Sequence, residues 1–330
     1  MSLLLQNVVF LTVVSVLCLC VVCFVYIQTR YLYHPESYSC PPDLPPWKLS
    51  LHCHPHHHAD NHTSLTTSSS ESIVVALLVP VIGTITTVRS ERQVIPLERF
   101  PLLTIFLPSL LESICNHTQQ RVTASPFVFE YVLYLGFDEG DLFLSNSSNV
   151  NVLHARFDEL SRSYPLSLKV RSFSGMNGAP CWVWNALADQ ALHDGSHYLY
   201  QLNDDVRFES PGWTELFVET LRNNSIHGDV GVTGPIDNNN TRIFTQSFVS
   251  RLHLVIFDSF YPKVFKNWWS DDWITQVYHP RHSFRTTARV HNTNAQGTRY
   301  TVAWAAQFLL SKEVSRGREL IDSWLLHPRH

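Results

Sequence analysis

The pattern of hydrophobic and polar positions divides the chain into three regions. Residues 8–27 carry no charge, and about 20 apolar residues suffice to cross a bilayer as a helix. Residues 30–70 show no sustained periodicity and are rich in Pro, His, Ser and Thr, a composition that cannot bury enough apolar surface to fold. Residues 71–330 alternate apolar runs with amphipathic segments. We therefore predict an N-terminal anchor over residues 1–29, a low-complexity stem over 30–70 and one folded domain over 71–330.

Apolar runs in the third region predict the strands of a sheet. Residues 72–79 are almost continuously apolar, which is typical of a strand buried on both faces of a parallel sheet. Further strands are predicted over residues 127–137, 166–173, 197–202 and 229–235, and helical spacing separates them over residues 97–114, 152–163, 181–193 and 213–221. This alternation favours right-handed βαβ units, so we predict an α/β fold with a mostly parallel, doubly wound sheet.

The pattern is less regular beyond residue 235. Apolar runs cover residues 247–257 and 268–277, and a segment rich in Arg, His and Asn continues to about Gly297. We expect no regular structure in that segment. The last apolar run, residues 300–310, fits either a strand or a short helix.

The apolar N-terminal span lacks the marks of a cleaved signal peptide. No basic residue precedes it and no small-residue cleavage site is visible. We therefore predict an uncleaved signal anchor that crosses the membrane once. Arg30 follows the span, so the positive-inside rule alone would place the downstream chain in the cytoplasm.

Two features of the downstream chain favour a lumenal location instead. Four cysteines follow the span, an even number that fits either two disulfides in an oxidising lumen or buried free thiols. Glycosylation acceptors of the form Asn-x-Ser/Thr also follow it, at Asn61, Asn116, Asn146, Asn223 and Asn239. We therefore expect a glycoprotein of the Golgi or ER membrane whose folded domain is lumenal.

Charge and composition narrow the range of partners. The formal net charge is −4 and no Lys/Arg-rich run occurs, so we expect no nucleic-acid partner. The histidine-rich segment 52–58 has no fixed ligand spacing and fits a solvated spacer better than a metal site.

The most informative polar group follows the predicted strand over residues 197–202. Asn203, Asp204 and Asp205 come directly after it, and open α/β sheets bind their ligands at the carboxyl ends of the strands. Carboxylate oxygens there suit Mg²⁺ or Mn²⁺, which are usually held by one or two carboxylates together with substrate phosphates. A turn is the alternative, because Asn and Asp populate turns for local hydrogen-bonding reasons.

Five short motifs occur along the chain in a recognisable order. They are the strand end at Pro80, the acidic cluster at Asp138, the Gly/Asn-rich turn with Asn177 followed by the helix residue Asn185, the Asn203-Asp204-Asp205 segment, and the Asn-Trp-Trp-Ser-Asp-Asp-Trp segment over 267–273. From about residue 72 to residue 310, this order resembles the GT-A type of nucleotide-sugar-dependent glycosyltransferase. The resemblance is to the family-2-like enzymes and to the N-acetylglucosaminyltransferase I group.

The resemblance implies a site for a nucleotide-diphosphate sugar and for Mn²⁺ or Mg²⁺. Asp205 would be the direct metal ligand, and Asp204 would contact the ribose or reach the metal through water. Asn203 stands where the family more often has an acid, which leaves open how the ribose is held. Asp138 would contact the nucleotide base. His282 would be a second metal ligand, although a surface histidine is the alternative.

The resemblance also implies further donor-binding residues. Pro80, Asn177 and Asn185 would contribute to the donor site. Arginines of the C-terminal segment could hold the diphosphate, namely Arg281, Arg285 and Arg289.

An acceptor hydroxyl needs a general base within hydrogen-bond reach. Asp271 and Asp272 are the candidates, and the indoles that flank them should raise the pKa of a carboxylate by desolvation. We predict that Asp272 is the base, which implies inversion at the anomeric carbon. The alternative is that both acids cap a helix that begins at Trp273. The neighbouring tryptophans could stack on a sugar or fill the core.

The sequence therefore predicts a metal-dependent hexosyl- or N-acetylhexosaminyl-transferase of the secretory pathway. Its acceptor would be a hydroxyl of a glycan, glycoprotein or glycolipid. A catalytically inactive sugar-binding or scaffolding protein is the alternative, because fold does not secure function. A nucleotidyltransferase is disfavoured, since residues 81–85 lack a Gly-rich loop with a basic residue.

Overall fold

The computed structural model describes residues 71–86, 92–119, 127–224, 226–294 and 300–327. The predicted membrane span and stem lie outside these ranges. Within them, no helix combines the length and the apolar character needed to span a membrane.

An eight-stranded sheet forms the centre of the domain, in the order β5-β4-β1-β6-β9-β8-β10-β7. Strands β1 (Glu71–Pro80), β4 (Phe127–Asp138), β5 (Leu166–Phe173) and β6 (Tyr198–Gln201) are mutually parallel. The second half of the sheet contains β9 (Phe248–Ser250), β8 (Val232–Asp237), β10 (Ser283–Asn292) and β7 (Val206–Phe208). There β8 and β10 are parallel, whereas β9 and β7 are antiparallel to their neighbours. Four of the seven pairings are therefore parallel, which confirms the predicted α/β class with a parallel-rich sheet.

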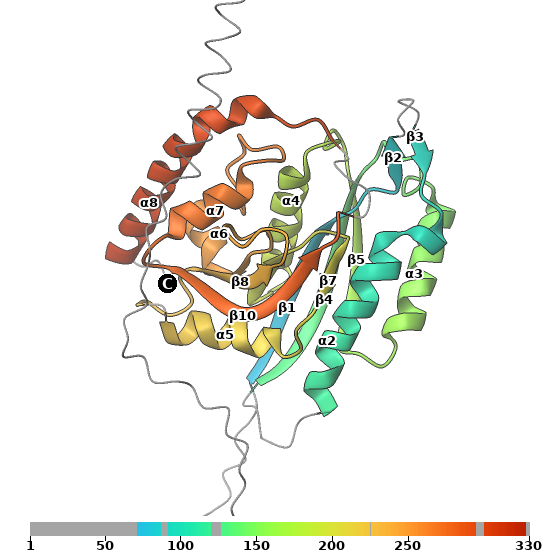
Figure 1. Cartoon of the computed structure of the whole chain (residues 1–330), viewed down its shortest axis with the longest axis horizontal. Helices are drawn as coiled ribbons and strands as arrows, with labels where there is room; N and C mark the ends of the chain where they lie inside the picture. Colours follow the sequence, from blue (N-terminus) through green and yellow to red (C-terminus); the bar gives the residue numbers. More distant parts are fainter. Residues whose placement is uncertain (1–70, 87–91, 120–126, 225, 295–299, 328–330) are drawn as a thin grey trace, which may run out of the picture. The chain divides into compact units, whose positions relative to one another are not determined.

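Helices cover both faces of this sheet, which explains the unbroken apolar run of β1 (Figure 1). Ile73, Val75 and Leu77 belong to one buried cluster, and Ala76 and Leu78 to a second one. The first cluster includes residues of α2 (Leu107–Gln119), α3 (Ser147–Ser161) and α5 (Trp213–Asn224). The second includes residues of α4 (Pro180–His193), α6 (Leu252–Phe257), α7 (Ser270–Tyr278) and α8 (Leu310–Leu326).

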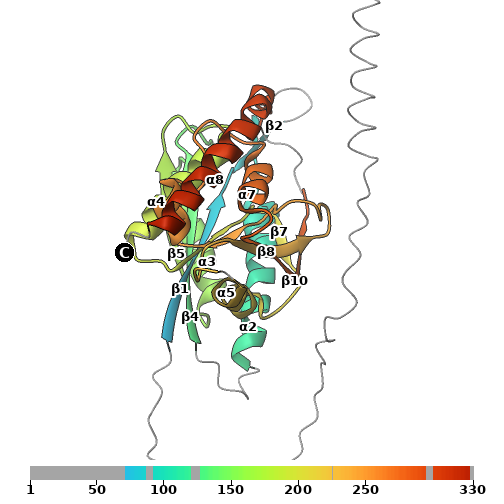
Figure 2. The same cartoon turned by 90° about the vertical axis from the view of Figure 1, so that its left-hand side faces the viewer.

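The chain adds strands in one direction as far as β5 and then returns across β1 to add β6. Strands β4 and β5 lie on one side of β1, whereas β6 lies on the other side, and β1 and β4 run side by side in both views (Figure 1, Figure 2). The carboxyl ends of β1 and β6 therefore flank a topological switch point, where open α/β sheets bind ligands.

Several predicted elements differ from the observed ones. Residues 97–114 begin as η1 (Leu97–Arg99) and a π-helical segment, η2 (Leu102–Phe106), before α2 continues. Pro108 explains the irregular start, because it has no N–H to donate to the carbonyl of Thr104. The apolar run 247–257 divides into β9 and α6.

The region beyond residue 280 is more regular than predicted. Strand β10 forms from the segment rich in Arg, His and Asn, which we expected to be irregular. Its burial alternates, with Thr286, Ala288 and Val290 facing the interior. The last apolar run is η3 (Trp304–Leu309), and it leads into α8, which no pattern had predicted. A short separate sheet joins β2 (Thr84–Thr86) to β3 (Arg92–Val94).

The sequence left open whether the cysteines after the predicted span are paired or are buried free thiols. Cys181 is a buried free thiol that donates to the carbonyl of Asn267. The side chains of the other three cysteines that follow the predicted span lie outside the described part of the chain.

Candidate active site

Two adjoining cavities open at the switch point. The first, the β1–β4 pocket, is lined by Pro80, Asp138, Asp141, Asn177 and Tyr300 among others. The second, the acidic cavity, is lined by two pairs of carboxylates, Asp204–Asp205 and Asp271–Asp272. Its lining also includes the amides Asn203, Asn240, Asn267, Asn292 and Asn294. Pro80, Pro180 and Tyr300 line both cavities, so the two form one continuous site.

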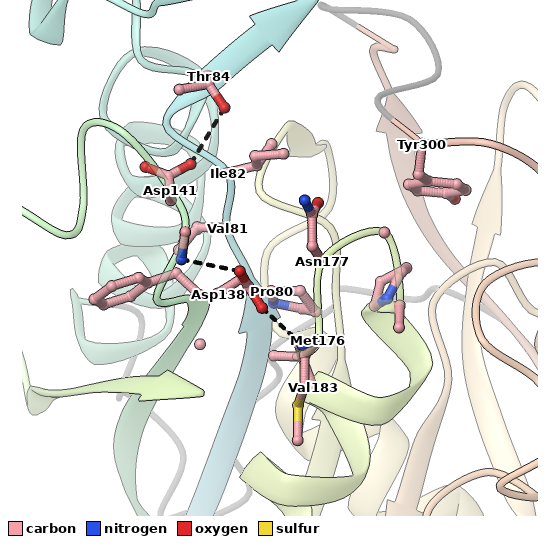
Figure 3. Close-up of a pocket in the computed structure, with 16 residues that line it drawn as sticks. Pro80, Val81, Ile82, Thr84, Asp138, Asp141, Met176, Asn177, Val183 and Tyr300 are labelled. Carbon is pink, nitrogen blue, oxygen red and sulfur yellow. Dashed lines mark hydrogen bonds between the residues drawn. The ribbon is translucent and has the colours of Figure 1, made fainter. Parts of the chain in front are cut away.

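Backbone amides hold the carboxylates of the β1–β4 pocket. Asp141 accepts hydrogen bonds from the N–H groups of Gly83 (2.8 Å), Phe143 (3.0 Å) and Leu144 (2.7 Å), and its Oδ2 lies 3.4 Å from the hydroxyl of Thr84. Figure 3 shows Asp141 and Thr84 on one side of the pocket and Tyr300 on the other. Asp141 therefore fixes the turn after β1 and the loop after β4 to each other.

Asp138 has a comparable position at the end of β4. Its Oδ2 accepts from the N–H of Met176 (2.6 Å) and its Oδ1 from the N–H of Gly140 (2.9 Å). This joins β4 to the turn after β5 that contains Asn177, whose side chain projects into the pocket in Figure 3. Asp138, Asn177 and Pro80 thus line one pocket.

Asp204 and Asp205 lie between β6 and β7. Asp204 is fully buried and Asp205 is 6% exposed. The carbonyl of Asp205 accepts from the hydroxyl of Thr293 at 2.9 Å, which joins this turn to the end of β10. The pair is therefore held between two strand ends at the wall of the acidic cavity.

Asp271 and Asp272 line the same cavity, from the first turn of α7. The helix begins at Ser270, after Trp269 in a left-handed conformation (φ 77°), so neither acid caps a helix that starts at Trp273. Burial and the neighbouring Asp272 raise the pKa of Asp271 to about 8. Burial also raises the pKa of Asp272, while the Arg242 guanidinium lowers it in part.

Arg242 belongs to the loop after β8, and it lines the acidic cavity together with Asn240. Buried Asp237 holds this loop by accepting from the N–H of Asn239 (2.9 Å) and the hydroxyl of Thr245 (2.7 Å). Arg285 holds it from β10, donating to the carbonyl of Arg242 at 2.8 Å. Arg285 therefore fixes the loop, and this contact does not support the predicted diphosphate role.

Two predicted site residues do not reach either cavity. The Asn185 amide donates to the carbonyl of Tyr261 (2.9 Å) and accepts from its N–H (2.7 Å), so it joins α4 to the chain after α6. His282 precedes β10, whose other end reaches the acidic cavity at Asn292. Ten residues of strand span about 30 Å, so the structure does not place His282 beside Asp205 and does not support it as a ligand of a shared metal.

The tryptophans near α7 divide into two groups. Trp273 is 2% exposed and fills the core beneath α8. Trp268 and Trp269 line the acidic cavity instead, and Trp304 contacts both of their rings. Trp304 and Tyr300 were missed from the sequence, because they lie on η3 and just before it, where no strand end or acidic motif marks a site.

The described residues contain no group of three or more His, Cys, Asp or Glu side chains arranged to hold a metal ion. The acidic cavity does offer hard oxygen donors, from carboxylates and amides, at its wall beside Asp205. Such donors match the preference of Mg²⁺ and Mn²⁺ when a substrate phosphate completes the coordination.

No known family model matches the chain, and no curated protein sequence matches it. It is similar in structure to S. aureus TarS in complex with UDP-GlcNAc, at 12% identity and a TM-score of 0.43, over 77% of this chain and 71% of that one. The UDP complex of TarS gives 11% identity and a TM-score of 0.42 over 74% of this chain, which spans 65% of that structure. A Bacillus anthracis protein assigned as a glucose-1-phosphate thymidylyltransferase, in complex with a sucrose, gives 11% identity and a TM-score of 0.38, over 76% of this chain and 96% of that one.

Proposed function

We propose that the protein is a GT-A-type glycosyltransferase, which moves a sugar from a nucleotide-diphosphate donor to an acceptor hydroxyl. One observation carries this proposal: Asp204 and Asp205 share a single cavity with Asp271 and Asp272, although about seventy residues separate the pairs in sequence. The cavity lies at the switch point of the sheet and continues into the β1–β4 pocket. A pocket joined to a cavity that contains two pairs of carboxylates suits a donor with two parts, a nucleoside and a sugar diphosphate, and the transfer of the sugar to an acceptor.

The β1–β4 pocket would hold the nucleoside. Asn177 offers amide donor and acceptor groups there, and Asp138 keeps the turn that contains Asn177 in place. The diphosphate would then extend past Pro80, which lines both cavities, toward Asp205. Asp205 and Asp204 would hold Mn²⁺ or Mg²⁺ together with the phosphate oxygens, and such an ion neutralises charge on a leaving diphosphate.

The α7 pair would act on the acceptor. With a pKa of about 8, Asp271 keeps its proton at neutral pH, so its neighbour faces no second negative charge. Arg242 favours the ionised form of Asp272. Neighbouring acids whose pKa values are driven apart are suited to different roles. Asp272 would therefore take the proton of the acceptor hydroxyl, and attack from that side inverts the anomeric centre.

The test is donor hydrolysis and transfer by the full-length protein. A panel of nucleotide sugars is incubated with and without MnCl₂, and released nucleotide is measured. We expect one donor to be hydrolysed in a metal-dependent way, and Asp205→Asn to reduce that rate by about a hundredfold or more. Asp158→Asn, which changes an exposed carboxylate on α3, is the matched control. A wild-type protein that is inert toward every donor but binds glycans would favour the sugar-binding alternative.

We also propose that residues 8–27 anchor the enzyme once in a Golgi or ER membrane, with the domain in the lumen. The uncharged span and the glycosylation acceptors support this. Glycosidase treatment of the expressed protein should increase its electrophoretic mobility. Cleavage of the domain by protease added outside intact vesicles would contradict the lumenal placement.

A further inference from the structure

Three indole rings gather beside the acidic cavity: Trp268 and Trp269 line it, and Trp304 packs against both of them. The ring centroids of Trp268 and Trp304 are 5.3 Å apart, and that of Trp269 lies 6.4 Å from the first and 6.2 Å from the second. Trp268 is 41% exposed and Trp304 is 59% exposed, so neither ring is used to fill the core. Large exposed aromatic side chains beside a polar cavity are uncommon without a binding role.

Asn267 holds this group of rings in place. Its amide nitrogen donates to the carbonyls of Gly178 and Thr301, both at 3.0 Å. Its amide oxygen accepts from the N–H groups of Trp268 (2.8 Å) and Ala303 (3.1 Å). One buried side chain therefore joins the turn of the β1–β4 pocket to both segments that carry the exposed tryptophans.

The Trp269 indole adds a polar feature to the same wall. Its N–H is buried and has no hydrogen-bond partner among the described residues, while its side chain lines the acidic cavity. A buried donor without a partner is unfavourable by itself, and the hydroxyl of a ligand could accept its hydrogen bond.

We propose that Trp268 and Trp304 form a platform for a pyranose ring of a glycan acceptor, beside the proposed base Asp272. This inference rests on the proposed function. A pyranose presents C–H groups on a face and hydroxyls at its edge, which matches exposed indole faces next to the carboxylates and amides of the cavity. The carboxylates of the cavity would repel the negative charge of an anionic membrane surface, so such a surface is disfavoured as the occupant.

The proposal predicts that binding of the acceptor, and not of the donor, depends on these rings. An aromatic contact of this kind contributes about 0.5–1.5 kcal/mol, so Trp268→Ala and Trp304→Ala should each weaken glycan binding by up to about tenfold. Donor hydrolysis without acceptor should stay within about twofold of wild type in Trp304→Ala, because Trp304 lines neither the β1–β4 pocket nor the acidic cavity. Phe308→Ala is the matched control, because it removes an 85% exposed ring from the same helix, η3, and no ring contact joins Phe308 to Trp268 or Trp269 among the described residues.

The experiment uses the full-length protein and the methyl glycosides of galactose, glucose, N-acetylglucosamine and mannose. Saturation-transfer NMR should show transfer to ring C–H protons of at least one glycoside, and the two tryptophan variants should reduce it while Phe308→Ala does not. No binding of any glycoside to the wild type, or equal loss in Phe308→Ala, would overturn the platform. So would tryptophan-dependent binding to phosphatidylcholine vesicles without glycan binding.

Donor hydrolysis separates this inference from the proposed function. If hydrolysis occurs but both tryptophan variants bind glycosides as the wild type does, the platform is wrong and the enzyme assignment stands. If the wild type hydrolyses no donor but binds glycosides through Trp268 and Trp304, the platform stands and the enzyme assignment is wrong.

Discussion

The β1–β4 pocket and the acidic cavity both contain carboxylates, but the surroundings of these carboxylates differ. In the pocket, Asp138 and Asp141 accept hydrogen bonds from backbone N–H groups on several segments. In the cavity, Asp271 and Asp272 lie near each other with pKa values raised by burial. Carboxylates of the first kind stabilise the loops that contain them. The pKa of about 8 at Asp271 means that this carboxyl titrates near neutral pH.

This difference shows that an acidic residue at a strand end is not by itself evidence for catalysis. Asp141 and Asp205 both follow strands and both are 6% exposed. The Asp141 side chain binds three backbone N–H groups and a hydroxyl, a pattern typical of a structural role. Substitutions in the two regions should accordingly affect different measurements.

The largest effect is expected for Asp272→Asn. Loss of a general base lowers kcat by about 10²–10⁴-fold, whereas removal of a half-buried charge near Asp271 should leave the melting temperature equal or higher. Transfer rates at saturating donor and acceptor, with a thermal melt of the same sample, measure both quantities. Transfer within about threefold of wild type would exclude Asp272 as the base.

Asp141→Ala should have the opposite profile. It leaves buried N–H groups at Gly83, Phe143 and Leu144 without their acceptor, and each such loss costs about 1–3 kcal/mol. We expect the free energy of unfolding to fall by about 4 kcal/mol, with kcat changed little below the melting temperature. Denaturant titration checks this, and Glu139→Ala, an exposed neighbour, is the control. Wild-type stability in Asp141→Ala would show that the loop does not depend on this side chain.

The last prediction concerns the pH dependence of the free energy of unfolding. Asp271 keeps a proton up to about pH 8 in the folded protein, whereas an aspartate in an unfolded chain loses it near pH 4. The folded state therefore binds more protons in this window, so this group makes the free energy of unfolding fall as pH rises. Asp271→Asn should make the free energy of unfolding decline less steeply with pH than in the wild type. Denaturant midpoints of both proteins at about pH 5 and pH 8 measure this difference. An unchanged slope in the variant would show that Asp271 ionises freely in the fold.

Sequence patterns predicted the first half of the sheet well. Strands β1, β4, β5 and β6 match their predicted ranges closely, and so does helix α4. The strands were visible because strands covered on both faces are apolar along their whole length. The alternating burial of β10 was also present in its sequence, at Thr286, Ala288 and Val290. The alternate residues Arg285, Thr287 and Arg289 are exposed, and the charged side chains among them concealed that alternation.

Local sequence by itself determined that Asn203-Asp204-Asp205 follows a buried strand and that Asp271 and Asp272 adjoin tryptophans. Only the tertiary structure decided that these pairs line one cavity, that Asn185 and His282 lie elsewhere, and that Trp304 joins Trp268. The physical reason is that hydrophobic periodicity reports which face of an element is buried. The side chains that meet at a strand end are set by crossover connections and by single long-range hydrogen bonds, such as those of Asn267, which leave no periodic trace in the sequence.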